Sequence, residues 1–114
     1  GVVTVNGNSG VILKSGTGGG SGNIQFMQGS TVISEVSTTA ILPGSDNSYN
    51  LGASDKRWAN IYSADLQLSN EGTEGNDIDG TTGSWTIQEG EEDLFIINRK
   101  TGKKYKFLLE EVTT

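Results

Sequence analysis

Three short apolar runs, separated by turn-forming residues, limit the fold of this chain more than any other feature. They are "WTIQ", "LFIIN" and "YKFLLEEV", which begin at Trp85, Leu94 and Tyr105. Such runs, bounded by Gly and charged turn residues, are typical of strands. Gly102 suits the left-handed position of a type I turn with a bulge. The sequence therefore predicts a three-stranded antiparallel meander over residues 85–112.

The middle run contains four consecutive apolar residues, Leu94–Ile97. Alternate residues of a strand point to opposite faces, so both faces of this strand are apolar and are expected to be covered. In the third run, Tyr105, Phe107 and Leu109 are predicted to share one face. A three-stranded sheet from one chain can cover only one of its faces, and we expect another subunit to cover the other.

The composition also favours an oligomer. Leu, Ile, Val and Phe supply only 27 of 114 residues, whereas Gly, Ser, Thr and Asn supply 50. This apolar fraction exceeds that of disordered chains but is small for a self-sufficient core. The chain has neither Cys nor His, which excludes disulfides, thiol chemistry and histidine acid–base catalysis. No apolar run approaches about 20 residues, so no membrane insertion is expected.

The net charge of −6 lies entirely in residues 61–114, which carry eleven acids and five bases. An acidic chain repels phosphates, so nucleic acid is not an expected partner. Lys103, Lys104 and Lys106 are predicted to form cross-strand pairs with Glu110, Glu111 and the Glu89–Asp93 cluster.

Residues 1–40 are predicted to be a Gly/Ser-rich β shaft segment. Asn6-Gly7 is a hairpin signal between "VVTV" and "VIL", the latter at Val11–Leu13. Gly16–Gly22 is interpreted as a flexible loop, because it lacks the helix that a phosphate-binding loop requires. Two further strands, "NIQFM" and "TVISEV", flank a turn at Gln28–Ser30.

Residues 41–68 are predicted to form a dense packing segment and a strand. Pro43 favours an extended Leu42, and Ser54 suits the N-cap of one helical turn near residues 55–60. On that turn Trp58, Ile61 and Tyr62 would share a face. From Tyr62 to Leu68 the apolar period changes to two, which predicts a half-buried strand. Packing is preferred for Trp58, although stacking of a sugar on an aromatic ring is the alternative use of Tyr49, Trp58, Tyr62 and Trp85.

Residues 69–84 are predicted to be an acidic loop that carries Glu71, Glu74, Asp77 and Asp79. The Asp77–Gly80 stretch resembles the start of a calcium loop but lacks the later ligands, so no metal or cofactor is assigned. Acid pairs are the only catalytic candidates that the composition leaves, and all of them lie in polar turns where nothing raises a carboxyl pKa. We therefore expect no catalytic residue and no enzyme activity.

Two segments resemble proteins of tailed bacteriophages. Residues 41–68 resemble a tail-fibre segment that reads approximately I-x-P-x-x-D-N-x-x-x-L-G-S-S-x-x-R-W-x-N-I-Y. The matching residues are Ile41, Pro43, Asp46, Asn47, Leu51, Gly52, Ser54, Arg57, Trp58, Asn60, Ile61 and Tyr62. Ala53 stands where that segment commonly has Ser. Residues 83–112 look like a C-terminal module of structural proteins from phages of aquatic bacteria.

The resemblance implies an all-β, elongated and intertwined homotrimeric fibre of a virion, with residues 85–114 as a terminal knob. Many such fibres continue into a self-cleaving chaperone domain. This sequence starts at Gly1, which suggests a processed chain or a fragment, and ends at Thr114 without that domain. We therefore expect its trimerisation to depend on its own modules or on a helper protein.

The expected function is attachment of a phage to its bacterial host. The expected partners are two further copies, other virion proteins, and a surface polysaccharide or outer-membrane receptor. The residues expected at the trimer interface are Leu51, Trp58, Ile61, Tyr62, Leu66, Leu94, Ile96 and Phe107. The residues expected to contact the receptor are Glu71, Glu74, Asp77, Asp79 and Trp85. The alternatives are a capsid decoration or appendage without a receptor, and a secreted monomeric carbohydrate-binding module.

Overall fold

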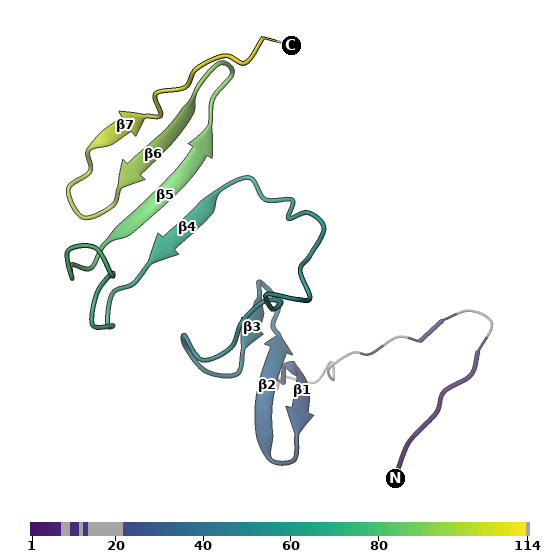
Figure 1. Ribbon diagram of the computed structural model, residues 1–114. Helices are drawn as coiled ribbons and strands as arrows, with labels where there is room; N and C mark the ends of the chain where they lie inside the picture. Colours follow the sequence, from purple (N-terminus) through teal and green to yellow (C-terminus); the bar gives the residue numbers. More distant parts are fainter. Residues whose placement is uncertain (8–9, 12, 14–21, 114) are drawn as a thin grey trace. The chain divides into compact units, whose positions relative to one another are not determined.

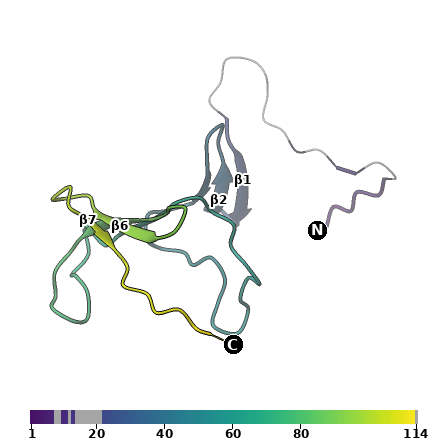
Figure 2. The same cartoon turned by 90° about the horizontal axis from the view of Figure 1, so that it is seen from above.

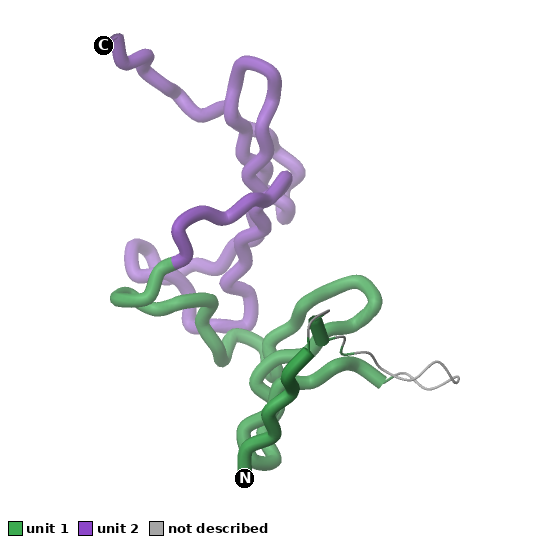
Figure 3. Tube along the Cα trace, turned by 90° about the vertical axis from the view of Figure 1, so that its right-hand side faces the viewer, with its two compact units in different colours: residues 1–57 green, residues 58–114 purple. Residues whose placement is uncertain are grey.

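The computed structural model describes residues 1–7, 10–11, 13 and 22–113. The chain divides into two compact units, residues 1–57 and 58–114 (Figure 3). The division falls inside the segment 41–68 that the sequence groups together. The described residues contain seven strands and no helix, so the all-β prediction is confirmed. No helix that is long and apolar enough to cross a membrane occurs in the described residues.

The first unit contains an antiparallel sheet of three strands in the order β1-β2-β3 (Figure 1). The strands are β1 (Ile24–Gln28), β2 (Thr31–Val36) and β3 (Ile41–Pro43). The first two strands and the turn between them are confirmed, and the turn contains Gly29 with a φ of 59°. The extended conformation expected for Leu42 is confirmed within β3.

Gly44 is required where β3 ends. Its N–H donates to the carbonyl of Ile33 over 2.8 Å, and a Cβ at this position would overlap the carbonyl oxygen of Val32. Only glycine lets the two backbones approach this closely. After Pro43 the chain therefore returns tightly against β2.

The hairpin predicted around Asn6-Gly7 does not form in the described residues. Val2 and Val3 are each 90% exposed, and residues 1–7 contain no strand. The second predicted strand, Val11–Leu13, and the loop Gly16–Gly22 lie partly or largely outside the described residues. An isolated two-stranded hairpin is marginal in water, and these valines have no apolar surface of the chain to pack against.

The helical turn predicted near residues 55–60 is also wrong. Ala53 and Lys56 exchange two backbone hydrogen bonds, of 3.0 and 3.1 Å, and form an isolated antiparallel bridge. A single helical turn fixes three residues for its first hydrogen bond, whereas this tight turn obtains two bonds across four residues. Because no helix forms, the common helical face predicted for Trp58, Ile61 and Tyr62 does not exist.

The second unit contains an antiparallel sheet of four strands in the order β4-β5-β6-β7 (Figure 1). The strands are β4 (Leu66–Ser69), β5 (Ser84–Glu89), β6 (Leu94–Asn98) and β7 (Lys104–Lys106). The C-terminal meander is confirmed as β5–β7. The sequence places β4 in a separate segment, and the structure corrects this by pairing β4 with β5 along its whole length.

Both edge strands of this sheet, β4 and β7, are shorter than the sequence predicts. The alternation from Tyr62 to Leu68 predicts a longer strand than β4, but residues 62–65 are unpaired. After β7 a single further backbone bond joins the Phe107 N–H to the Leu94 carbonyl at 2.9 Å. The chain then leaves the sheet and runs to the C-terminus (Figure 2).

Among the described residues, no large apolar side chain is buried, and the only fully buried side chain is that of Thr86. The Thr86 hydroxyl donates to Oε1 of Gln67 at 2.6 Å and accepts from Nε of Arg99 at 2.9 Å. These bonds offset the desolvation of a buried polar group. The sheet therefore has a satisfied polar centre on one face and no apolar core of its own.

The β6–β7 turn has the predicted backbone geometry at Gly102, where φ is 76°. The Gly102 N–H donates to the carbonyl of Asn98 at 2.8 Å. The Asn98 side-chain oxygen accepts from the N–H groups of Lys100 and Thr101 at 3.0 and 3.2 Å. This side chain fixes the turn that determines the register between β6 and β7.

Candidate functional site

The strand register gathers apolar side chains on one side of the second sheet. Leu66 pairs with Ile87, Ile87 with Ile96, and Ile96 with Tyr105, which makes one row across all four strands. Paired residues in antiparallel strands point to the same face, and so do residues two apart along a strand. The resulting apolar face consists of Leu66, Leu68, Trp85, Ile87, Leu94, Ile96, Tyr105 and Phe107.

Nothing in the described part of the second unit covers the apolar face. Leu66, Leu68 and Tyr105 are 50%, 47% and 46% exposed. The rings of Trp85 and Tyr105 lie 5.9 Å apart at an angle of 42°. Together with Leu68 and Ile96 they line a shallow, almost entirely apolar hollow of about 390 Å³.

The opposite face is different in character, because its centre is the network of Thr86 with Gln67 and Arg99. Phe95 and Ile97 of β6 also point to this side. The Phe95 ring lies against Gly90 in the β5–β6 turn, where an added Cβ would be 2.6 Å from the ring, and Phe95 remains 37% exposed. Neither face of β6 is completely covered within the chain.

The uncovered apolar face leaves hydrophobic area open to another surface. Fully burying one large apolar side chain contributes about 1.5–3 kcal/mol. Each half-exposed member of the apolar face therefore has about half of that still to gain from a partner. Contiguous apolar patches on soluble proteins mark sites where another surface binds.

The structure brings together four of the eight residues predicted at the trimer interface. Leu66, Leu94, Ile96 and Phe107 all belong to the apolar face. Trp58, Ile61 and Tyr62 precede β4 in the same unit and are 64%, 72% and 94% exposed.

The eighth predicted interface residue, Leu51, lies in the first unit. It is 77% exposed. It lines a hollow there with Tyr49, Leu42 and Ile33. The first unit therefore has an exposed apolar surface of its own beside β3.

The acidic loop between β4 and β5 is ordered by two asparagine side chains. Asn70 Oδ1 accepts from the Gly83 N–H at 2.7 Å and closes the base of the loop. Asn76 Oδ1 accepts from the N–H groups of Ile78 and Asp79, while its Nδ2 donates to Asp79 Oδ1 and to the Thr81 carbonyl. These hydrogen bonds give the loop a defined conformation.

Asp79 is a structural acceptor in this loop. Its Oδ1 accepts from the Thr81 hydroxyl at 2.8 Å, from Asn76 Nδ2 at 2.8 Å and from the Thr81 N–H at 3.1 Å. These bonds, led by that of the Thr81 side chain, lower the pKa of the carboxyl group below its ordinary value. A general acid needs a raised pKa, so the shift at Asp79 has the opposite direction.

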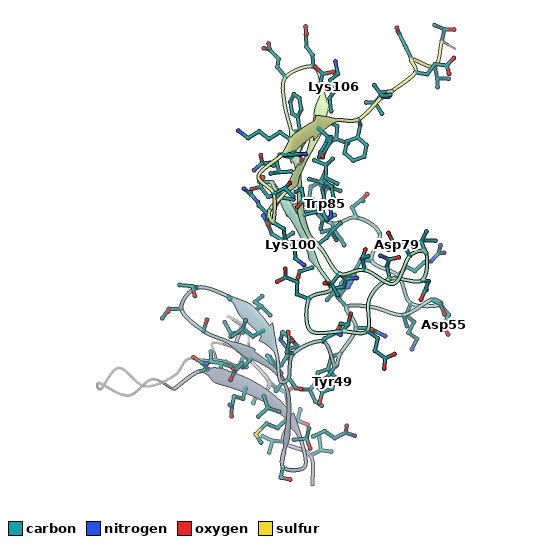
Figure 4. The ribbon with its side chains drawn as sticks, turned by 90° about the vertical axis from the view of Figure 1, so that its left-hand side faces the viewer. Tyr49, Asp55, Asp79, Trp85, Lys100 and Lys106 are labelled. Atoms are coloured by element: carbon teal, nitrogen blue, oxygen red, sulfur yellow. The ribbon has the colours of Figure 1, made fainter. Side chains whose placement is uncertain are left out.

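The predicted receptor-contact residues do not form one group. Glu71, Glu74, Asp77 and Asp79 are exposed on the loop. Trp85 belongs to the apolar face instead and lies on β5, whereas Asp79 lies in the loop (Figure 4).

Glu71 forms an ion pair with Lys100 at 3.4 Å. No other ion pair occurs in the part of the chain that the structure describes, so the predicted pairing of Lys103, Lys104 and Lys106 is wrong. The reason is geometric. Lys103 and Lys104 lie at the β6–β7 turn, at the end of the sheet opposite the Glu89–Asp93 turn, and Glu110 and Glu111 follow the last paired residue of β7. Lys106 lies nearer the Glu89–Asp93 turn, but no carboxylate of the described residues comes within ion-pair distance of it.

No group of three or more Asp and Glu side chains that could hold a metal ion occurs among the described residues. No protein-family model, no curated protein and no solved structure matches this chain.

The sequence patterns miss two components of this site. They place Leu68 and Tyr105 on apolar strand faces, but not on the same face of one sheet. The alternation of Trp85 and Ile87 with Thr86 and Gln88 is a signal for one apolar face on β5. Asn70 and Asn76 have no such signal, because their partners are backbone groups up to 13 residues away.

Proposed function

We propose that the chain is a structural subunit of a virion fibre of a tailed bacteriophage, assembled as a homotrimer and serving attachment to the bacterial host. The observation that carries the proposal is the uncovered apolar face in a chain whose described residues bury no large apolar side chain. A chain with this deficit gains its missing burial from other copies. The resemblance of residues 41–68 to tail-fibre segments supports the phage assignment.

The mass of the purified chain in solution tests the assembly. We expect three chains per particle by light scattering coupled to size exclusion at micromolar concentration. A stable monomer would refute the homotrimer. Ile96→Arg places a charge in the middle of the apolar face and is expected to dissociate the trimer, whereas Lys104→Glu, a charge change on the opposite face, is the control and is expected to leave the trimer intact.

Attachment is tested separately from assembly. Purified trimer is expected to bind bacterial envelope glycans or intact host cells, and deletion of residues 71–83 is expected to weaken that binding without changing the particle mass. A trimer that binds neither favours the alternative of a capsid decoration or appendage without a receptor.

A monomeric carbohydrate-binding module is the second candidate function. It is favoured by one observation: Trp85 lines both the apolar hollow and a second hollow whose lining includes the polar side chains of Asn70, Asn76 and Thr82. An aromatic ring beside amide and hydroxyl groups is a common arrangement for stacking and hydrogen-bonding a sugar. A monomer that binds glycans, and loses binding in Trp85→Ala, would select this function over the fibre.

A further inference from the structure

The two edge strands of the second sheet are both shortened at the same end. β4 starts at Leu66, although the apolar alternation begins at Tyr62, and β7 ends at Lys106, although the alternation continues to Leu109. Leu66 and Tyr105 lie in one row across the sheet. Both interruptions therefore occur at the end that contains the β5–β6 turn.

Within the described residues of a single copy, no strand lies beside these two segments. The β5–β6 turn ends the two central strands at this level, and β4 and β7 are separated by about 14 Å, which is three interstrand spacings. Tyr62 and Leu108 are each 94% exposed, and Leu109 is 70% exposed. In the described residues, no backbone hydrogen bond reaches residues 62–65 or 108–113 from outside their own segment.

We propose that the two segments complete each other between copies: residues 107–109 of one copy extend β7 and form a strand beside residues 62–65 of the next. This inference rests on the proposed homo-oligomer and names the surfaces that join it. β4 runs parallel to β6, and β7 runs antiparallel to β6. Copies that point the same way along a symmetry axis therefore bring the segments together in antiparallel directions, as in an ordinary ladder.

The charges at the two edges are complementary. Asp65 accepts a hydrogen bond from Gln88 at 3.1 Å, Gln88 pairs with Phe95, and Phe95 pairs with Lys106. Asp65 and Lys106 thus occupy one row and one face, on opposite edges of the same sheet. Neither has an ion-pair partner within the described ranges. When sheets stand side by side at equal height, Lys106 of one copy meets Asp65 of the next.

The apolar side chains agree with the same junction. Tyr62 and Ala64 alternate with Asp65 on the side of Leu66, and Phe107 and Leu109 alternate with Lys106 on the side of Tyr105. Pairing the two segments therefore continues the apolar face from one copy to the next. It also closes both open edges, which otherwise present unpaired backbone groups.

The cross-linking experiment uses a chain that has no cysteine of its own. Asp65→Cys and Lys106→Cys are combined in one chain and oxidised under native conditions. A disulfide needs Cα atoms within about 7 Å, so the two positions cannot be joined within one sheet. A ring of three copies is expected to appear as a covalent trimer on a non-reducing denaturing gel, with most chains in that band.

The single variants Asp65→Cys and Lys106→Cys are the controls and are expected to remain monomeric on the gel. Mixing and refolding them together is expected to give covalent dimers. A native trimer in which the double variant forms no cross-link would overturn the strand pairing and leave the proposed function intact. A native monomer would overturn both.

Discussion

At the scale of single residues, the acidic loop shows how side chains replace strand pairing. Asn70 and Asn76 accept and donate bonds that a ladder would otherwise provide, and Asp79 completes the set. Asn and Asp commonly bond to backbone groups two or three residues away, which makes them good loop-building residues. The sequence suggests calcium or receptor binding for the loop carboxylates. One of them, Asp79, instead stabilises the loop through its hydrogen bonds.

The lowered pKa of Asp79 predicts how this loop responds to acid. Its charged form is preferred in the folded state, so its contribution to stability is complete above its ordinary pKa of about 4 and is lost as the pH falls through the lower folded value. Amide NMR signals of Asn76 and Thr81 are expected to hold their positions down to about pH 4 and to shift below it.

Glu74→Gln is the control for this titration, because Glu74 makes no side-chain hydrogen bond among those within the described loop. It is expected to leave the titration at Thr81 unchanged, whereas Asp79→Asn is expected to abolish it. A Thr81 signal that titrates above the ordinary Asp range would contradict the stabilising role of the carboxylate.

At the scale of elements, two glycines beside β6 are required for different reasons. Gly90 lies against the Phe95 ring, so an added side chain would meet that ring. Gly102 has open space around it but a φ of 76°. The constraint at Gly102 is therefore conformational, since the left-handed region destabilises an L-residue by about 1–2 kcal/mol.

Gly102→Ala is expected to destabilise the protein by about 1 kcal/mol, measured by urea unfolding at a fixed chain concentration. Gly102→Asn is expected to cost less, because Asn adopts this conformation more readily. Equal stability of the wild type and the Ala variant would show that the turn relaxes to another geometry.

The same scale shows what the sequence could predict. β1, β2, β5 and β6 are found from the sequence because each combines alternating or continuous apolar residues with a turn signal at its end. The prediction of a helical turn near Trp58 is wrong. The N-cap residue and the apolar spacing indicate only a local preference, and a tight turn with two backbone hydrogen bonds forms instead. The place of β4 in the second sheet is missed, since its partner β5 lies beyond a 14-residue loop closed by Asn70.

The candidate site was predictable in part for a related reason. The Leu94–Ile97 run implies that a partner covers the sheet, and the register confirms that both faces of β6 are apolar and incompletely covered. The sequence overestimates the length of the edge strands. A local apolar alternation indicates that a segment can form a strand, but it does not indicate whether the chain supplies a strand to pair with it. Tyr62 and Leu109 have strand patterns, but no strand of the described part of the chain lies beside them.

At the scale of the whole molecule, each unit has a small sheet with incompletely covered side chains, and the charge of the second unit is uneven along its sheet. Lys106 lies toward one end of this sheet and Lys100 toward the other (Figure 4). At the Lys100 end, the acidic loop faces the basic β6–β7 turn and forms the Glu71–Lys100 ion pair. The other end contains six carboxylates, at Glu89, Glu91, Glu92, Asp93, Glu110 and Glu111.

This asymmetry predicts that salt strengthens the proposed trimer. Copies that point the same way bring their six-carboxylate ends together, and the repulsion between them is screened over about 8 Å at 0.15 M salt compared with about 30 Å at 0.01 M. The proposed Asp65–Lys106 contacts would respond in the opposite direction, but there is one such pair per copy against six carboxylates, so the repulsion is expected to dominate. The midpoint temperature of thermal dissociation is therefore expected to be higher in 0.15 M NaCl than in 0.01 M NaCl.

The double variant Glu91→Gln/Glu92→Gln is expected to raise this midpoint at low salt and to reduce its salt dependence. Copies that alternate in direction would place carboxylates beside the basic turn, and their association would weaken as salt is added, which is the result that excludes a parallel arrangement.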